Sequence, residues 1–336
     1  MTQMHRVRRG AAAGLGVATA LALTACGGNL GGGESADAES FPDGPITILV
    51  GFDPGGSTDL IGRAVADGLS DELGVPVSVE NRPGANGAVA AQQFLSAEPD
   101  GQTLMVINGS LAYITPMAVS EDEVVDINDF EVITGLSLDD YVLVTSPSTG
   151  FTSLEDVANA DRTVTYGTAG VGTGSQLSSE LLFNQLDVEA TAVPFDGGSP
   201  TLTAVLGGQV DVGSIQLGEA IEQIESGELV PLVTFAEERP EYLPDTPTAI
   251  EAGYDVPVQQ SRALVAPEGT PEEIVDQLQE ATQAVFETEQ YQQFNENNLL
   301  TPNEIDGEEL QQRWTENLES YRSLVDEYGI DLGGAQ

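Results

Sequence analysis

The sequence predicts an α/β protein in which strands alternate with helices. Short apolar runs rich in β-branched residues, such as residues 46–50, alternate with segments that have helical apolar spacing. Glycine-rich turns directly follow two of these runs. Strands that are apolar along most of their length are typical of a parallel sheet covered by helices on both faces. The 336 residues are enough for two domains, and we expect about eight to ten strands.

The first unit is a strand, a tight turn and a helix. Residues 46–50 form the strand, Pro54-Gly55-Gly56 the turn, and helical spacing then continues to Gly74. The first turn of a helix has free backbone N–H groups and a partial positive charge, and glycines let a ligand approach them closely. The unit therefore predicts an anion site. The alternative is that the glycines only make the bend, with Ser57 or Thr58 as the N-cap.

The next elements lead to a second lobe. Strands are expected at 75–81 and 103–107, on either side of a turn at 82–87 and an alanine-rich helix at 88–97. Residues 141–147 form a strand that we interpret as the first crossover between lobes. Thr152-Ser153-Leu154-Glu155 fits a capping box that begins the following helix.

A second unit of strand, glycine turn and helix follows. Residues 163–166 form its strand, residues 167–175 its turn, and its helix has leucines on one face at 177, 181, 182 and 186. Two helix N-termini that face one cleft could hold one carboxylate from both sides. Gly170-Val171-Gly172 resembles the core of a dinucleotide fingerprint, but Ser175 stands where the third glycine belongs. We therefore do not expect a nucleotide site.

The alternation continues to the end of the chain. Further strands are expected at 190–194, 209–215, 230–235 and 259–267, and we interpret the last as the return crossover. Pro200 is expected to begin a helix with Ser199 as its N-cap, and Thr270-Pro271 to cap a later helix. Other helices are expected at 219–225, around Tyr291 and over 308–326. The last contains Trp314, which we interpret as a core anchor.

The N-terminus has the features of an export signal. A basic start precedes a small apolar stretch that is too short for a membrane span. Leu23-Thr24-Ala25-Cys26-Gly27 then resembles the lipobox of bacterial lipoproteins. We expect a signal peptide at 1–25, lipidation of Cys26 and a flexible tether at 26–42. The alternative is an ordinary signal peptide with an incidental cysteine.

Composition excludes several classes of function. The chain has 55 acidic residues, 10 Arg, no Lys and a formal net charge of −45, which excludes nucleic-acid binding by charge. We interpret this surface as an adaptation to high salt. The one histidine is His5 and the one cysteine is Cys26, so histidine, lysine and thiol catalysis are unavailable to the mature chain. We expect no enzyme activity, no cofactor and no metal site. Helix dipoles and rare Arg side chains would hold an anion.

Several blocks have the order and spacing of one family. They are Pro45-Ile46-Thr47, Pro54-Gly55-Gly56-Ser57-Thr58-Asp59, Val79-Glu80-Asn81-Arg82-Pro83-Gly84-Ala85-Asn86-Gly87 and Pro99-Asp100-Gly101-Gln102-Thr103-Leu104. From residue 41 onward the chain resembles the solute-binding proteins of tripartite tricarboxylate transporters, the Bug or TctC-like family. The resemblance implies a two-lobed periplasmic-binding-protein clamshell of type II, the Venus-flytrap type, with hinge crossovers. Lobe 1 would contain residues 43–142 and 262–336, and lobe 2 residues 143–261.

The resemblance also implies a function. The protein would be an extracytoplasmic, lipid-anchored monomer that captures a small mono-, di- or tricarboxylate between its lobes. It would deliver this ligand to the permease subunits of a tripartite tricarboxylate transporter. The alternative is a sensor that presents its ligand-bound form to a membrane receptor kinase, because the same clamshell serves both roles.

Fourteen residues form the candidate ligand site. Asp59 is expected to orient the first turn more than to touch the ligand. Arg262 would pair with a second carboxylate of the ligand, or else form a surface or interlobe salt bridge. The set is Phe52, Gly55, Gly56, Ser57, Thr58, Asp59, Asn108, Ser110, Thr168, Ala169, Gly172, Thr173, Gln176 and Arg262.

Two positions depart from the family's pattern. Many members have His where this chain has Gln176, and Tyr-Lys-Gly where it has Phe195-Asp196-Gly197. Asp196 would repel an anion if it faced the cleft. We therefore expect it to point elsewhere, or the ligand to carry less charge than citrate.

Overall fold

The structure is a computed structural model that describes residues 40–120 and 124–333. These residues belong to one compact unit. The predicted signal peptide, Cys26 and nearly all of the predicted tether lie outside the described residues.

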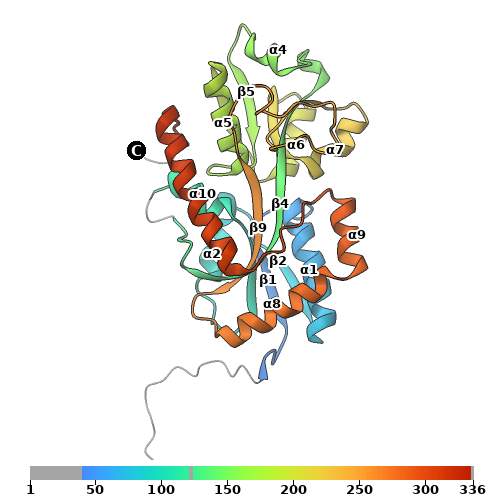
Figure 1. Ribbon diagram of the computed structural model, residues 1–336, viewed down its shortest axis with the longest axis vertical. Coiled ribbons are helices and arrows are strands. Elements are labelled where there is room, and N and C mark those ends of the chain that lie inside the picture. Colours follow the sequence, from blue (N-terminus) through green and yellow to red (C-terminus); the bar gives the residue numbers. More distant parts are fainter. Residues whose placement is uncertain (1–39, 121–123, 334–336) are drawn as a thin grey trace, which may run out of the picture. The chain divides into compact units, whose positions relative to one another are not determined.

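One mixed sheet of nine strands runs through the described part of the chain, within the expected range (Figure 1). The strand order is β2-β1-β3-β9-β4-β7-β5-β6, and β8 also pairs with β4. The strands are β1 (Ile46–Val50), β2 (Val77–Asn81), β3 (Thr103–Asn108), β4 (Phe130–Thr145), β5 (Val164–Thr168), β6 (Ala190–Pro194), β7 (Val212–Gln216), β8 (Val230–Thr234) and β9 (Gln259–Pro267).

Two long strands join the halves of this sheet. Parallel pairing holds within each half, between β1 and its neighbours β2 and β3, and between β5 and its neighbours β6 and β7. The crossover strands β4 and β9 instead run antiparallel to each other and to β3, β7 and β8. The expectation of parallel strands is therefore wrong for the crossovers. The chain leaves the first half on β4 and returns on β9, which pairs beside β4 in the opposite direction. The predicted lobe boundaries fall within β4 and β9 and stay a prediction.

Helices cover both halves of the sheet (Figure 1). In the first half α1 packs on β2 and α8, and in the second half α6 and α7 pack on β7 and β4. The helices are α1 (Ser57–Leu73), α2 (Ala88–Phe94), α3 (Ser110–Tyr113), α4 (Leu154–Ala158), α5 (Gly174–Leu186), α6 (Gly198–Leu206), α7 (Leu217–Glu225), α8 (Glu272–Phe286), α9 (Glu289–Asn297) and α10 (Gly307–Tyr328), with short 3₁₀ turns η2 (Ala85–Gly87), η3 (Thr115–Met117) and η5 (Pro147–Thr149).

Glycines begin the helices that matter for the site. The N-cap of α1 is Gly56, and neither Ser57 nor Thr58 caps it, so the N-cap of the alternative interpretation is wrong. The N-cap of α6 is Gly197 in place of the predicted Ser199, and it too makes no side-chain cap bond. Neither N-cap residue therefore places a side-chain oxygen of its own on the first N–H groups of its helix.

Two other helix starts also differ in detail from the prediction. A capping box begins α4, but one position later than predicted: Ser153 is the N-cap and Asp156 its partner at the third helical position, in place of Thr152 and Glu155. Helix α8 has Pro271 as its N-cap and no side-chain cap bond, so Thr270 does not cap it.

Helix α10 packs on elements of both halves, namely α3, α5 and β4. Trp314 is fully buried there, and its Nε1 donates a 2.9 Å hydrogen bond to Ser261 Oγ. The edge of its ring faces Tyr113, with the ring centroids 6.0 Å apart. The interpretation of Trp314 as a core anchor is confirmed. Within the described ranges, no helix combines the length and apolar character needed to cross a membrane.

Candidate ligand-binding site

Three helix N-termini meet at one pocket between the halves of the sheet. Its wall includes Ser57 at the start of α1, Gly198 at the start of α6 and Gln216 just before α7. In none of these helices does the N-cap residue bond the first turn through its own side chain. Their partial positive charges therefore converge on one small space. The cavity of about 50 Å³ has room for only a few water molecules, at about 10–15 Å³ each.

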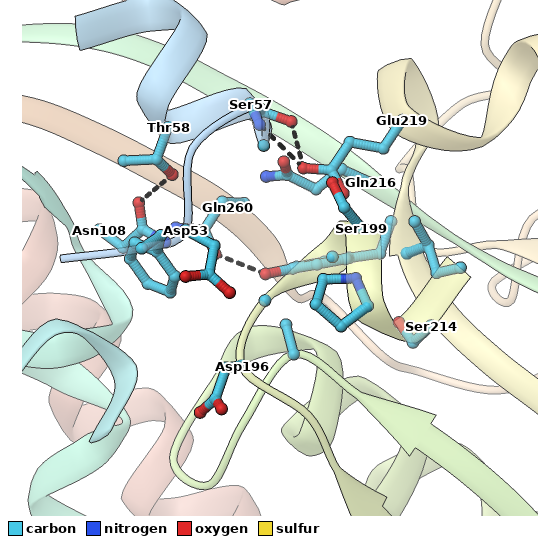
Figure 2. Close-up of a pocket in the computed structure, with 18 of the residues that line it drawn as sticks. Asp53, Ser57, Thr58, Asn108, Asp196, Ser199, Ser214, Gln216, Glu219 and Gln260 are labelled. Carbon is cyan, nitrogen blue, oxygen red and sulfur yellow. Dashed lines mark hydrogen bonds between the residues drawn. The ribbon is translucent and has the colours of Figure 1, made fainter. Parts of the chain in front are cut away.

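A carboxylate of the protein already binds one of these N-termini. Glu219 Oε1 accepts hydrogen bonds from the backbone N–H of Ser57 at 3.0 Å and from its hydroxyl at 2.5 Å (Figure 2). Ser57 belongs to α1, whereas Glu219 belongs to the first turn of α7. The first donors of α1 thus bind a carboxylate of the protein itself, and their use for a ligand anion stays a prediction.

Asp59 holds the first glycine turn in place. Its Oδ2 accepts a 2.9 Å hydrogen bond from the Gly55 backbone, and its carboxylate also pairs with Arg63 and accepts from Asn81. Burial raises the pKa of Asp59, but these hydrogen bonds and the Arg63 charge outweigh it and leave the pKa below its ordinary value. Asp59 is 2% exposed and does not line the pocket, which is the loop-orienting geometry expected of it.

Arg262 lines the pocket but is already paired. It is 1% exposed, and its NH1 forms an ion pair with Asp139 and a 3.0 Å hydrogen bond to Ser137. Its Nε donates to Thr58 Oγ1 at 3.0 Å, and its NH2 donates to Gln216. The pair is not a surface salt bridge. The guanidinium charge is therefore offset by a buried carboxylate before any ligand arrives.

The second glycine turn packs against the first half of the sheet and contributes little to the pocket wall. The Gly172 N–H donates to Gln176 Oε1 at 2.8 Å, and the Gly172 carbonyl accepts from Asn86 and from Thr115. Thr173 Oγ1 donates to the Gly170 carbonyl at 2.8 Å. The Gly172 carbonyl therefore serves the contact between the halves, while the other two bonds hold the turn itself. Of the predicted residues in this turn, only Ala169 lines the pocket.

The remaining predicted residues divide between the pocket and its support. Phe52, Gly56 and Asn108 line the pocket, and Asn108 Oδ1 accepts a 3.0 Å hydrogen bond from Thr58. Other predicted residues lie outside its wall, and their role as ligand contacts stays a prediction: Gly55, Asp59, Ser110, Thr168, Gly172, Thr173 and Gln176.

Sequence reasoning missed a large part of the pocket wall. The missed residues follow β1, β6 or β7, or lie on β7 and the crossover strands: Asp53, Tyr141, Gly197, Gly198, Ser199, Pro200, Ser214, Ile215, Gln216, Glu219 and Gln260. Phe195-Asp196-Gly197-Gly198-Ser199-Pro200 carries the same signal as the other two turns, because glycines directly follow a strand and precede a helix. Applying that rule a third time would have added the start of α6 to the candidate ligand site.

Acidic side chains outnumber basic ones around the pocket. Asp53, Asp196 and Glu219 line it, against the single Arg262 that Asp139 already neutralises. Asp196 is exposed at the rim, and Figure 2 shows its carboxylate on the side away from Ser57 and Glu219. Because Asp196 is among the lining residues, the expectation that it points away from the cleft stays a prediction. Attraction for an anion must therefore come from the helix N-termini.

The two-lobed sheet, with two crossover strands and a pocket between the halves at which helix N-termini meet, defines a solute-binding protein of the periplasmic type. The solved structures agree. The periplasmic binding protein BugD is 27% identical, covers 87% of this chain and 99% of its own, and superposes with a TM-score of 0.80. MatC from Rhodopseudomonas palustris with bound malate is 29% identical, covers 85% of this chain and 100% of its own, and has a TM-score of 0.79.

The sequence comparisons give the family. The model of the tripartite tricarboxylate transporter family receptor matches residues 61–330. A UPF0065 protein encoded in the gbd 5' region of Cupriavidus necator is 32% identical in an alignment 337 residues long, gaps included, which covers 98% of this chain and 99% of that protein. The chain belongs to the tripartite tricarboxylate transporter receptor family. It is a substrate-binding receptor and not an enzyme.

Proposed function

We propose that this receptor captures a small carboxylate between its two lobes and delivers it to the permease subunits of a tripartite tricarboxylate transporter. The lobes are those predicted from the sequence, residues 43–142 with 262–336 and residues 143–261. The ligand carboxylate binds at the N-terminus of α1, and the starts of α6 and α7 face it from the other half of the sheet.

The contact between Ser57 and Glu219 carries this proposal. Its two donors, one backbone N–H and one hydroxyl, converge on a single carboxylate oxygen. Hydrogen bonds to a charged oxygen are the strong class, and the helix dipole adds to them. A ligand carboxylate in the position of the Glu219 carboxylate would receive the same two bonds. The family's name and the malate found in MatC support the same ligand class.

The charge of the pocket narrows the ligand class. The pocket wall has three acidic side chains and one arginine, whose charge Asp139 already offsets. No cationic side chain of the wall is therefore free to offset the third carboxylate of a tricarboxylate ligand. A monocarboxylate or a dicarboxylate therefore suits the pocket better than citrate does.

The location follows from the same family. Its members include periplasmic binding proteins, so the folded domain works outside the cytoplasm. Cys26 attaches it to the membrane through a lipid, and residues 26–42 act as the tether. Labelled fatty acid should enter the chain in cells, and Cys26→Ser should abolish both the label and recovery with membranes.

Thermal unfolding of the Cys26→Ser chain at high salt tests ligand binding. The panel contains acetate, malate, succinate, adipate and citrate, with glucose and an alkylamine as controls. A ligand at about 100 times its Kd adds roughly 2.7 kcal/mol of stability, which raises Tm by several degrees. We expect malate or another small dicarboxylate to raise Tm and the controls to leave it unchanged. A cooperative transition that no carboxylate shifts would refute the proposal.

A further inference from the structure

Glu219 joins the two halves of the protein across the pocket. It lies on α7, which packs on β4, β7 and α6, whereas Ser57 lies on α1, which packs on β1, β2 and α8. The two hydrogen bonds from Ser57 to Glu219 Oε1 therefore connect elements from opposite sides of the pocket. No other acidic side chain among the described residues accepts a hydrogen bond from Ser57.

The second oxygen of this carboxylate lies in an unusual place. Glu219 Oε2 is buried and has no hydrogen-bond partner. A Cβ atom built on Gly198 would lie 1.7 Å from it, so the carboxylate fits only because residue 198 is glycine. The carboxylate thus lies between the first residues of α1 and α6. A buried carboxylate oxygen with no donor is costly, and such a site favours an occupant with better partners.

We propose that Glu219 is an internal competitor for the ligand carboxylate and thereby sets the affinity and specificity of the pocket. The proposal rests on the proposed function, because it places the ligand carboxylate at the α1 N-terminus. Glu219 fills the donors of Ser57 and bridges the halves until a ligand carboxylate displaces it. A ligand then binds tightly only if its carboxylate accepts both hydrogen bonds from Ser57. Its other groups must also make favourable contacts with the remaining residues of the pocket wall.

The opposite role for Glu219 makes different predictions. If the side chain stayed in place and accepted a hydrogen bond from a hydroxyl or ammonium group of the ligand, removing its charge would weaken binding. Competition predicts that removing its charge strengthens binding, because the ligand no longer displaces a charge-assisted contact. The sign of the change in Kd therefore separates the two roles.

The first test needs no ligand. Spin labels at Glu72→Cys on α1 and Glu155→Cys on α4 report the distance between the halves in the Cys26→Ser chain, since both positions are exposed. Glu219→Gln and Glu219→Ala should each shift the distance distribution toward longer values when no carboxylate is added. Glu222→Gln, an exposed position on the same helix, is the matched control and should leave the distribution unchanged. Distributions that do not change in either Glu219 variant would overturn the proposal.

The second test measures affinity by calorimetry with malate and succinate. Glu219→Gln should lower Kd by about tenfold or more, the size expected for one charge-assisted hydrogen bond, and Glu222→Gln should change it less than twofold. An unchanged or higher Kd in Glu219→Gln overturns the proposal. If no carboxylate binds to any variant, the proposed function fails, while the distance measurement still decides whether Glu219 holds the halves together.

Discussion

Thr115 and Gly172 fasten the second glycine turn to the first half of the sheet. Thr115 Oγ1 donates a 3.0 Å hydrogen bond to the Gly172 carbonyl, and a Cβ atom on Gly172 would lie 2.8 Å from Thr115 Cα. Asn86 Nδ2 donates to the same carbonyl at 3.0 Å. Like the contact between Ser57 and Glu219, these hydrogen bonds connect the two halves of the protein.

Gly172→Ala should destabilise the fold more than its backbone conformation alone requires. The φ of Gly172 is +71°, which costs an L-residue about 1–2 kcal/mol, and the new methyl group would also meet the backbone of Thr115. We expect the free energy of unfolding to fall by about 3 kcal/mol in urea titrations.

Gly150→Ala is the control for this variant. Gly150 has a similar φ of +81°, but a Cβ atom there meets nothing within 4 Å. The free energy of unfolding of Gly150→Ala should fall by only about 1–2 kcal/mol. If the free energy of unfolding falls equally in the two variants, the backbone at Thr115 moves aside for the new methyl group at no energetic cost.

Arg262→Met should be among the most destabilising single changes at the pocket. It leaves Asp139 buried without its ion-pair partner, which costs about 3–5 kcal/mol. Arg313→Met, which removes only an exposed ion pair with Glu309, should cost less than about 1 kcal/mol. Urea titrations at neutral pH compare the two.

A double variant separates the ion pair from simple loss of packing. Adding Asp139→Asn to Arg262→Met should recover part of the loss, because no uncompensated charge then stays buried. If the double variant is as unstable as the sum of its single changes, the Arg262 side chain acts by its volume and its other hydrogen bonds alone.

The regular elements could be predicted because their signals are local. The strands Ala190–Pro194 and Gln259–Pro267 have the predicted bounds, since each is an apolar run between turn residues. The first part of β4 was missed because Gly135, Ser137 and Asp139 interrupt its apolar run. Tertiary contacts explain that stretch: Asp139 pairs with Arg262, and Gly135 lies where a Cβ atom would meet the Asn303 carbonyl at 2.1 Å.

The pocket was harder to predict than the fold because its residues come together only through topology. Glu219 is separated from Ser57 by 162 positions, and no local pattern shows that α7 delivers its carboxylate to α1. The second glycine turn has the same local signal as the first but packs against Thr115 and Asn86. A shared motif therefore predicted two helix N-termini correctly and did not show which of them faces the pocket.

Thr58→Val should weaken ligand binding by disturbing the side chains behind the α1 N-terminus. Thr58 Oγ1 accepts from Arg262 Nε and donates to Asn108 Oδ1, each at 3.0 Å, and valine does neither. We expect Kd for the best-binding carboxylate to rise about tenfold by calorimetry, since two buried polar groups lose their partner.

Thr58→Ser keeps the hydroxyl and provides the comparison. It should bind within about threefold of the unaltered chain if the hydrogen bonds are what matters. A serine variant as weak as the valine variant would instead assign the effect to packing of the threonine methyl group.

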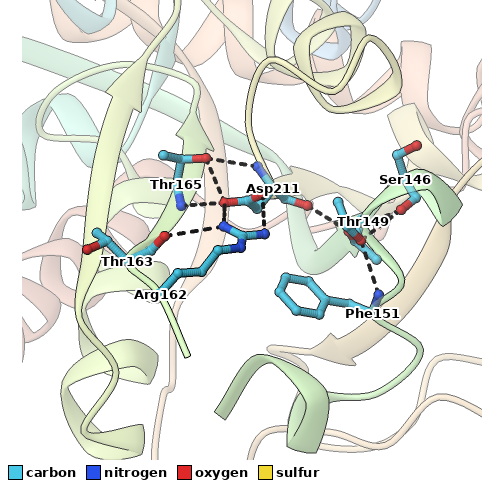
Figure 3. A network of polar contacts seen from close by, with 8 residues as sticks. Ser146, Thr149, Phe151, Arg162, Thr163, Thr165 and Asp211 are labelled. Atoms are coloured by element: carbon cyan, nitrogen blue, oxygen red, sulfur yellow. Dashed lines mark hydrogen bonds and ion pairs between the residues drawn. The ribbon is translucent and has the colours of Figure 1, made fainter. Parts of the chain in front are cut away.

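Asp211 provides a test of pH dependence outside the pocket. Its carboxylate accepts two hydrogen bonds from Arg162, one from the Thr165 backbone at 2.8 Å and one from the Thr165 hydroxyl at 2.9 Å (Figure 3). Burial raises the pKa of Asp211, but these bonds and the Arg162 charge outweigh it, so the pKa lies below its ordinary value.

The sign of the effect on stability follows from that direction. A carboxyl group with a lowered pKa in the folded state stabilises the fold above its unfolded pKa of about 3.9, and this stability is lost as the pH falls through the folded pKa. Asp211→Asn should therefore be less stable than the unaltered chain by about 1–3 kcal/mol at pH 7. The difference between the two should shrink as the pH falls below about 4.

Urea titrations followed by circular dichroism between pH 7 and pH 3 would measure this difference. Comparing two chains at each pH cancels the contribution of the other acidic residues, which are numerous in a chain with 55 of them. The exposed neighbour Asp161, changed to Asn, should show no comparable loss at pH 7. If the loss caused by Asp211→Asn is the same at pH 3 and pH 7, the Asp211 charge does not stabilise the junction between β5 and β7, and the hydrogen bonds that asparagine can still accept account for its role.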